Sequence, residues 1–262
     1  MAFLLVHGLA SNLHLWDGVA EELADRGHAV VAVDLRGHGR SDKPDDGYDL
    51  ATAAGDLAEL VRVLELDRPV AVGQSWGGNV AIELGWRFPE LVRGVVGVDG
   101  GWIELRRRFP DWDDCAHVLA PPSVSGLTAA ELEARLRARH PDWPQRGIAG
   151  ALACYERLAD GTVRPWLDLD HHLAILRDLW EHPPSERYPD VKVPVLLIPA
   201  DTGVNDDEAW ARERRTLVEG AAAALPSCEV AWMSGDHDLH AQHPEQLAEL
   251  LHRAAVDRWL AS

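Results

Sequence analysis

The sequence has few cysteines and no long apolar run. It contains 3 cysteines, an odd number, and they are widely separated: Cys115, Cys154 and Cys228. This argues against a disulfide framework and against paired metal ligands, so we expect small buried hydrophobic residues at these positions. No window holds the roughly 20 uninterrupted apolar residues of a membrane-spanning helix, and no basic region precedes an apolar stretch at the N-terminus. We therefore expect a cytoplasmic protein.

Basic residues are also scarce. The chain has 25 lysines and arginines against 43 acidic residues, which gives a formal net charge of -18 at pH 7. This charge repels nucleic acid phosphates and anionic membranes, so neither is an expected partner. A small uncharged molecule is the substrate class that fits best, while the oligomeric state is left open.

Short apolar runs alternate with longer amphipathic stretches along the 262 residues, 47% of which are hydrophobic. The runs FLLVHG, AVVAVDLRG, PVAVGQS, VRGVVGVDGG, VPVLLIPAD and CEVAWMSGD have the pattern of short strands that end in Gly, Asp or Ser. Helical patterns lie between most of them, for example over 51–64 and 79–87. The alternation predicts an α/β fold, in which a mostly parallel central sheet carries helices on both faces.

One region interrupts this alternation. Residues 102–187 contain helical patterns and proline breaks but no convincing strand, and Thr128 is the expected N-cap of one helix. We therefore predict an inserted helical cap over 102–187, between core parts 1–101 and 188–262. We expect most of its tryptophans to fill a small cap core. Pockets, however, favour interfaces and aromatic walls, so the candidate substrate-binding residues are Trp102, Trp143 and Trp180.

A serine follows the third strand pattern in the stretch PVAVGQSWGG. The residues from Gly73 to Gly77 stand between this strand and a helix that begins near Gly78, which is the context of a G-x-S-x-G nucleophile elbow. The glycines permit the tight turn, because larger side chains two positions on either side of Ser75 would clash. Ser75 is then exposed at a helix N-terminus, where the dipole and the free N–H groups favour a developing negative charge.

Two further stretches supply partners for a serine nucleophile. LLVHGLAS ends an early strand, and the N–H group of Leu9 in its loop can form an oxyanion hole with that of Trp76. WMSGDHDLHAQHPE places His237 just beyond the last strand pattern. With VHG, DLRGHGRSDKP, GQSWGG, VPVLLI and GDHDLHAQHPE in this order, the chain resembles the α/β-hydrolase superfamily over nearly its full length, in particular its cofactor-independent serine hydrolases.

The resemblance implies that Ser75 is the nucleophile and His237 the general base, with no cofactor and no metal. The chemistry agrees, because an imidazole with an unperturbed pKa of about 6.5 can take the serine proton near neutral pH. His240 and His243 extend HDLHAQH into a possible metal cluster, which we regard as the weaker interpretation. The resemblance also implies that DLRGHGRSDKP shapes the fold, so we expect no catalytic role for Asp34, Arg36, His38 and Ser41.

The acid of the triad stays open. In most of the superfamily it follows the strand that reads VPVLLIPAD here, a few residues beyond a glycine, but this chain has IPADTGVNDD at that point. Asp201 is the first choice, and Asp99, after the preceding strand, is the second. Asp206 and Asp207 are further alternatives. The acid matters because it fixes the tautomer of the histidine.

The resemblance also implies two strands ahead of the VHG strand. Here that strand begins at Phe3, so we expect the first two strands of the usual sheet to be absent, or the given start to lie inside a longer product.

These parts predict hydrolysis of a carboxylic ester or lactone of a small, mostly apolar substrate through an acyl-enzyme on Ser75. By resemblance, a serine argues against dehalogenases and epoxide hydrolases, which use an aspartate nucleophile. A carbon-carbon bond hydrolase or a perhydrolase would keep the same triad, and a ligand receptor on this fold would not turn over. A metal-dependent hydrolase would survive Ser75→Ala. The basic run 106–108 could meet a substrate carboxylate, although such a run is more often a solvated face.

Overall fold

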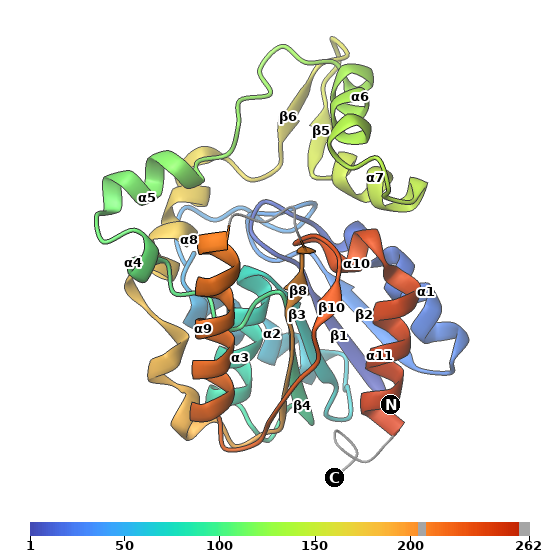
Figure 1. Cartoon of the computed structure of the whole chain (residues 1–262). Coiled ribbons are helices and arrows are strands. Elements are labelled where there is room, and N and C mark those ends of the chain that lie inside the picture. The colour runs from blue at the N-terminus through green and yellow to red at the C-terminus, as the bar shows by residue number, and fades with distance from the viewer. Residues whose placement is uncertain (204–207, 257–262) are drawn as a thin grey trace.

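A six-stranded parallel sheet forms the centre of the computed structural model, which describes residues 1–203 and 208–256 (Figure 1). Its order is β2-β1-β3-β4-β7-β9, and every neighbouring pair in it is parallel. The predicted α/β fold with a mostly parallel sheet is therefore confirmed. The strands are β1 (Ala2–Val6), β2 (Ala29–Val33), β3 (Val70–Gln74), β4 (Gly94–Val98), β7 (Val195–Ile198) and β9 (Cys228–Val230).

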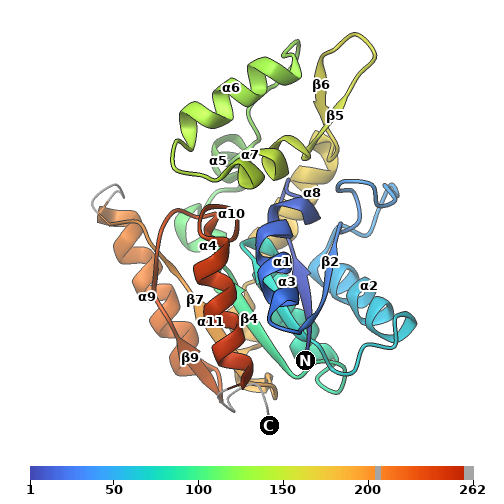
Figure 2. The same cartoon turned by 90° about the vertical axis from the view of Figure 1, so that its right-hand side faces the viewer.

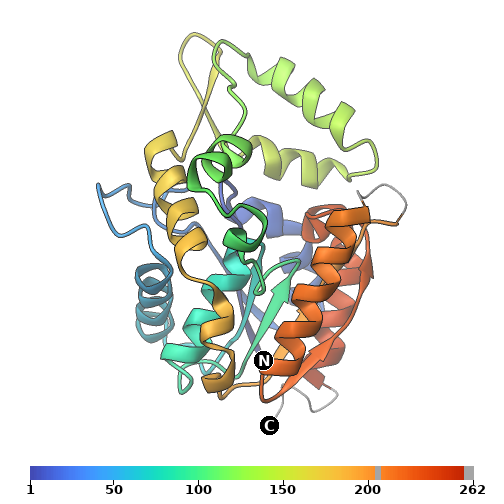
Figure 3. The same ribbon diagram turned by 60° about the vertical axis from the view of Figure 1, so that its left-hand side comes forward.

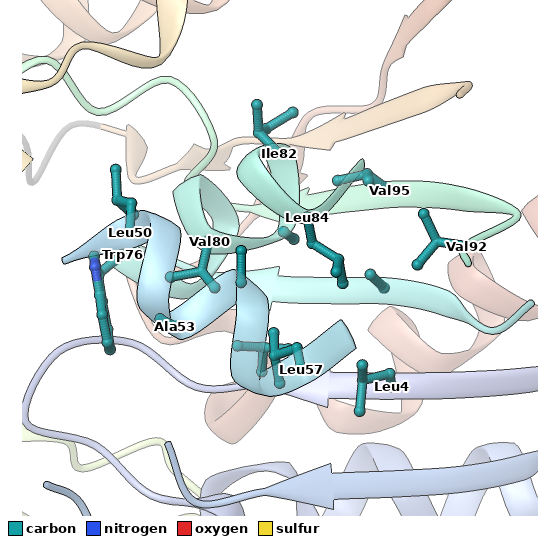
Figure 4. Close-up of a cluster of buried hydrophobic side chains, with 14 of the residues drawn as sticks. Leu4, Leu50, Ala53, Leu57, Trp76, Val80, Ile82, Leu84, Val92 and Val95 are labelled. Carbon is teal, nitrogen blue, oxygen red and sulfur yellow. The ribbon is translucent and has the colours of Figure 1, made fainter. Parts of the chain in front are cut away.

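Helices cover both faces of this sheet, because side chains of a strand alternate between its two sides. Phe3 and Leu5 of β1 pack with the helices α1 and α11, whereas Leu4 and Val6 pack with α2, α3 and α9. Figure 4 shows the second cluster, with Leu4 close to side chains of α2 and α3. The helices are α1 (Asp17–Asp25), α2 (Leu50–Val63), α3 (Trp76–Arg87), α9 (Glu208–Ala224) and α11 (Pro244–Val256).

The segment 102–187 leaves the sheet after β4 and returns before β7. Most of it lies across the carboxyl ends of the strands in three views (Figure 1, Figure 2 and Figure 3), and its last part descends beside the core toward the start of β7. Thr128 caps α6 as expected, and its side chain forms a reciprocal capping box with Glu131. The elements of this segment are α4 (Leu105–Arg108), α5 (Trp112–Leu119), α6 (Ala129–Arg139), α7 (Gln145–Leu152), β5 (Tyr155–Arg157), β6 (Val163–Pro165) and α8 (Leu169–Glu181).

The expectation that 102–187 contains no strand is wrong. β5 and β6 form an antiparallel hairpin in which Tyr155 pairs with Pro165. Its turn uses Gly161 at a φ of 85°, and the Leu158 N–H donates to the Thr162 carbonyl. Each strand has only three residues, so the sequence carried no periodic signal for it.

A second, two-stranded parallel sheet follows β7 and β9 in the chain. It consists of β8 (Ala200–Asp201), which follows β7 after Pro199, and β10 (Met233–Ser234), which follows β9. The run CEVAWMSGD thus forms two strands, β9 and β10. The remaining elements are η1 (Leu13–Trp16), η2 (Pro184–Glu186), η3 (Tyr188–Asp190) and α10 (Leu239–Gln242). Among the described helices, none is both long and apolar enough to cross a membrane.

Truncation of a core side chain tests this packing. Leu197 of β7 is fully buried, so Leu197→Ala should lower the free energy of unfolding by about 3 kcal/mol through lost burial and a new cavity. Val63→Ala is the control, because Val63 is 68% exposed and its loss should cost less than about 0.5 kcal/mol. Urea unfolding measures both, and equal losses would contradict the assigned core.

Candidate active site

Ser75 occupies a strained turn between β3 and α3. Its φ of 53° and ψ of -124° lie outside the regions that a serine ordinarily adopts, and its N–H donates to the Val98 carbonyl at 3.0 Å. A Cβ atom at Gly73 would lie 1.9 Å from the Gly77 carbonyl oxygen, and one at Gly77 would lie 2.4 Å from the His7 carbonyl oxygen. Both glycines are therefore required sterically. The helix begins at Trp76, two residues before the expected Gly78.

The predicted oxyanion-hole residues stand beside this serine. The loop after β1 approaches so closely that a Cβ at Gly8 would lie 3.1 Å from Ser75 Cβ. Leu9 and Trp76 line the same cavity as Ser75. In the described part of the chain, no acceptor takes a hydrogen bond from the N–H of either residue. These two N–H groups therefore stay the candidates for an oxyanion hole.

The stretch DLRGHGRSDKP supports the backbone around this loop. Asp34 accepts hydrogen bonds from the N–H groups of Leu13 and Arg40, and the Ser41 hydroxyl donates to the Asp34 carbonyl. His38 accepts from the Ala10 N–H at 3.2 Å. The Arg36 guanidinium pairs with Asp56 at 2.7 Å. Each of the four residues thus makes a contact that stabilises the local structure.

His237 and Asp99 form the closest side-chain pair in the site. His237 Nδ1–H donates to Asp99 Oδ2 at 2.6 Å, although 138 residues separate them in sequence. Asp99 directly follows β4, has a φ of 40° and is only 5% exposed. Its other oxygen, Oδ1, accepts from the Ala200 N–H at 3.0 Å. Because Nδ1 is the donor, Nε2 of His237 is left as the proton acceptor.

The first choice of acid, Asp201, is not in contact with His237 in this geometry, whereas the second choice, Asp99, is. Its carboxylate is exposed at the end of β8 and accepts a hydrogen bond from the Gly203 N–H at 3.3 Å. β4 and β7 are neighbours in the sheet, so an aspartate at the end of either strand could approach the histidine. Asp99 does so, whereas the Asp201 side chain points to solvent. Asp206 and Asp207 lie outside the described residues.

The charges around His237 favour its protonated form. Desolvation by the surrounding protein lowers the pKa of His237, but the hydrogen bond to Asp99 and the negative charges of Asp99 and Asp238 raise it to about 9. Arg214 acts in the opposite direction. Neutral His237, the form that can accept a proton, therefore becomes more abundant as the pH rises toward 9.

A cavity of about 420 Å³ brings these residues together between the core and segment 102–187. From the core it is lined by Leu9, Ser75, Trp76, Asp99, Trp210 and His237. From 102–187 it is lined by Trp102, Leu105, Arg108, Leu119, His172 and Leu176. Most of these side chains are apolar, and the candidate nucleophile and histidine both face the cavity.

Only one of the three predicted substrate-binding tryptophans lines this cavity, namely Trp102. Trp143 does not line it: its indole N–H donates to Asp236 at 2.8 Å and its ring packs against His140. Trp180 does not line it either, because it is 6% exposed within segment 102–187 and its indole donates to the Phe109 carbonyl. Tryptophan content alone does not distinguish a pocket wall from a small core.

Trp210 is one of the cavity residues that sequence reasoning missed. It lies on α9, where the Arg108 guanidinium stands 3.2 Å from its ring centroid and pairs with Glu213 at 3.1 Å. The basic run 106–108 is thus divided: Arg106 lies over Trp180, Arg107 pairs with Glu104, and only Arg108 lines the cavity. The run is neither a simple solvated face nor an unpaired anion site.

The remaining histidines do not form a metal site. Within the described residues there is no group of three or more His, Cys, Asp or Glu side chains that could hold a metal ion. His240 is fully buried, its ring lies 4.5 Å from that of Trp16, and burial lowers its pKa to about 3.

An NMR titration distinguishes the two aspartates. In the wild type, the imidazole of His237 should titrate near pH 9, and the His237→Gln spectrum assigns its signal among the 13 histidines. Asp99→Asn should lower this pKa, since the hydrogen bond and charge that raise it are lost while desolvation remains. Asp201→Asn should leave the pKa unchanged. The opposite pattern would restore Asp201 as the acid.

Comparisons with known proteins identify the family of the chain. A family model described as the alpha/beta hydrolase fold matches residues 2–160. A 2-(acetamidomethylene)succinate hydrolase from Mesorhizobium japonicum is 31% identical over 200 residues, which cover 74% of this chain and 68% of the relative. A crystal structure of E-2-(acetamidomethylene)succinate hydrolase has a TM-score of 0.77 at 28% identity and covers 97% of this chain and 91% of that one.

Two other comparisons bear on the fold and on length. An esterase from Mycobacterium tuberculosis has a TM-score of 0.73 at 24% identity, with 98% of this chain and 84% of that chain covered. Uncharacterized proteins of Mycobacterium bovis and Mycobacterium tuberculosis are 42% identical over 102 residues, but the match spans only 30% of their length. From the family model and the Mesorhizobium relative, the chain belongs to the α/β-hydrolase family.

Proposed function

We propose that this chain is a serine hydrolase that cleaves a carboxylic ester or lactone of a small, mostly apolar substrate. The observation that carries the proposal is the 2.6 Å hydrogen bond between His237 and Asp99 in the cavity that Ser75 also lines. A serine hydroxyl is a weak nucleophile unless a base removes its proton. His237, held by Asp99, can act as that base.

The chemistry follows from these positions. Nε2 of His237 takes the proton of Ser75 Oγ while the oxygen attacks the carbonyl carbon. The N–H groups of Leu9 and Trp76 stabilise the negative charge on the carbonyl oxygen. His237 then gives the proton to the leaving group, and a water molecule releases the acyl group by the same steps. Asp99 stabilises the imidazolium that forms in each half-reaction.

The lining of the cavity supports an uncharged, mostly apolar substrate. Its two arginines are already paired, Arg108 with Glu213 and Arg214 with Asp99. The name of the Mesorhizobium relative indicates that an acidic substrate is possible in this family. Here a substrate carboxylate would have to compete with Glu213 for Arg108, so a neutral ester fits the cavity better.

Covalent labelling tests the proposed nucleophile without knowledge of the substrate. After incubation with a fluorophosphonate, the wild type should gain the mass of one adduct, since the probe reacts with activated serines. Ser75→Ala should gain none, and His237→Ala should react far more slowly. Ser125→Ala is the matched control, because Ser125 is exposed in the loop before α6, and it should label like the wild type. A wild type that stays unlabelled beside a reactive control hydrolase would refute the proposal.

The apolar wall predicts a dependence on acyl chain length. Leu105 lines the cavity, so Leu105→Ala should lower the ratio of kcat/KM for a hexanoyl ester over an acetyl ester by about tenfold, because only the longer chain loses a contact. Leu169→Ala should leave the ratio unchanged, since Leu169 is 52% exposed on α8. The p-nitrophenyl esters provide the assay. An unchanged ratio in Leu105→Ala would show that the acyl chain does not contact this part of the cavity wall.

A further inference from the structure

The carboxylate of Asp99 uses its two oxygens differently. Oδ2 accepts from His237, and Oδ1 accepts from the Ala200 N–H at 3.0 Å. Oδ1 also lies 3.7 Å from Nε of Arg214, which is ion-pair distance without a close hydrogen bond. The acid is thus enclosed by a histidine, a peptide N–H and a guanidinium, and only the first of these belongs to the proposed proton transfer.

Arg214 reaches this position from α9 and approaches Oδ1, whereas His237 contacts Oδ2. Its side chain is 17% exposed and lines the cavity. Nη1 of the same guanidinium donates to the Ala200 carbonyl at 3.1 Å. One arginine therefore contacts both the acid and the residue whose N–H binds that acid. Ala200 belongs to β8, so the contact joins three elements: α9, β8 and the end of β4.

We propose that Arg214 is a positioning residue for the triad acid, which it holds together with the Ala200 backbone so that Oδ2 stays directed at His237. The inference rests on the proposed function, since it assigns how the acid of that reaction is kept in place. Asp99 has a single bond between its Cα and Cβ about which the carboxylate can turn, and contacts on Oδ1 restrict that rotation. A fixed carboxylate in turn fixes the plane and the tautomer of the imidazole.

The charge of Arg214 has a second effect on the same histidine. The charged or titratable groups around His237 include Asp99 after β4, Arg214 on α9, and Asp238 and His240 at α10. Asp236 and His140 lie next to Asp238. The carboxylates favour the imidazolium, and Arg214 opposes them. Removal of its positive charge should therefore raise the pKa of His237 and leave less neutral base at a given pH.

The test uses the rate of fluorophosphonate labelling at Ser75 as a function of pH. Arg214→Gln removes the charge, and Arg214→Lys keeps the charge but cannot reproduce the two-point contact. Arg215→Gln is the matched control, because Arg215 is the next residue on α9 and its guanidinium lies over Trp232 instead. Thermal melting followed by circular dichroism confirms that each variant is folded.

In Arg214→Gln, the rising limb of the pH profile should move to higher pH, and labelling near neutral pH should slow roughly tenfold. This loss is much smaller than the roughly 10⁴-fold loss in kcat that removal of a triad acid can cause. Arg214→Lys should keep the limb near its wild-type position with a smaller loss of rate. Arg215→Gln should match the wild type in both. A purely structural role would lower the rate without moving the limb.

Three results would overturn the assignment. The first is a wild-type pH profile in Arg214→Gln, and the second is an equal shift in Arg215→Gln. If Arg214→Gln does not fold, Arg214→Lys decides, and a lysine variant with wild-type rates at every pH would exclude a positioning role. In each of these cases the wild type is still labelled, so the proposed function stands. An unlabelled wild type would instead refute the proposed function and this assignment with it.

Discussion

Direct contact between backbone segments at Ser75 is the constraint on which the site depends. The turn after β3, the loop after β1 and the turn after β4 meet there with no room for side chains between them: a Cβ atom at Gly100 would lie 2.1 Å from the Ser75 carbonyl oxygen. This crowding holds the serine in a conformation it would not adopt alone. It also brings the Leu9 N–H and the Asp99 carboxylate to the same place, because both follow directly from segments in that contact.

The local parts of the site could be predicted from the sequence, and the long-range parts could not. Ser75 and its glycines form a continuous motif whose steric requirement is readable from the residues, and His237 lies in a recognisable turn after a strand. The choice between Asp99 and Asp201 depends on distances across two adjacent strand ends, which no local pattern encodes. The sheet itself was predictable because both of its faces are covered and its strands therefore form apolar runs.

The sequence did not distinguish the tryptophans that line the cavity, and it did not reveal the shortest strands, for related reasons. Trp143 and Trp180 have the same composition signal as Trp102, but their indole N–H groups already have protein acceptors, Asp236 of the core and the Phe109 carbonyl of segment 102–187. Trp210 carried no signal because it lies on α9, outside the region where a pocket wall was expected. The hairpin of β5 and β6 is too short for periodicity and is specified by its turn.

The hydrogen bond from Trp143 to Asp236 links the cap segment to the loop that carries the proposed general base. Asp236 immediately precedes His237. Nδ1 of His140, also in segment 102–187, lies 3.4 Å from Oδ2 of Asp236. Segment 102–187 therefore contacts the loop of His237 as well as the cavity. Exchange of this segment for that of a relative would need to carry over an indole or an equivalent donor at this point, or the alignment of His237 would change together with the shape of the cavity.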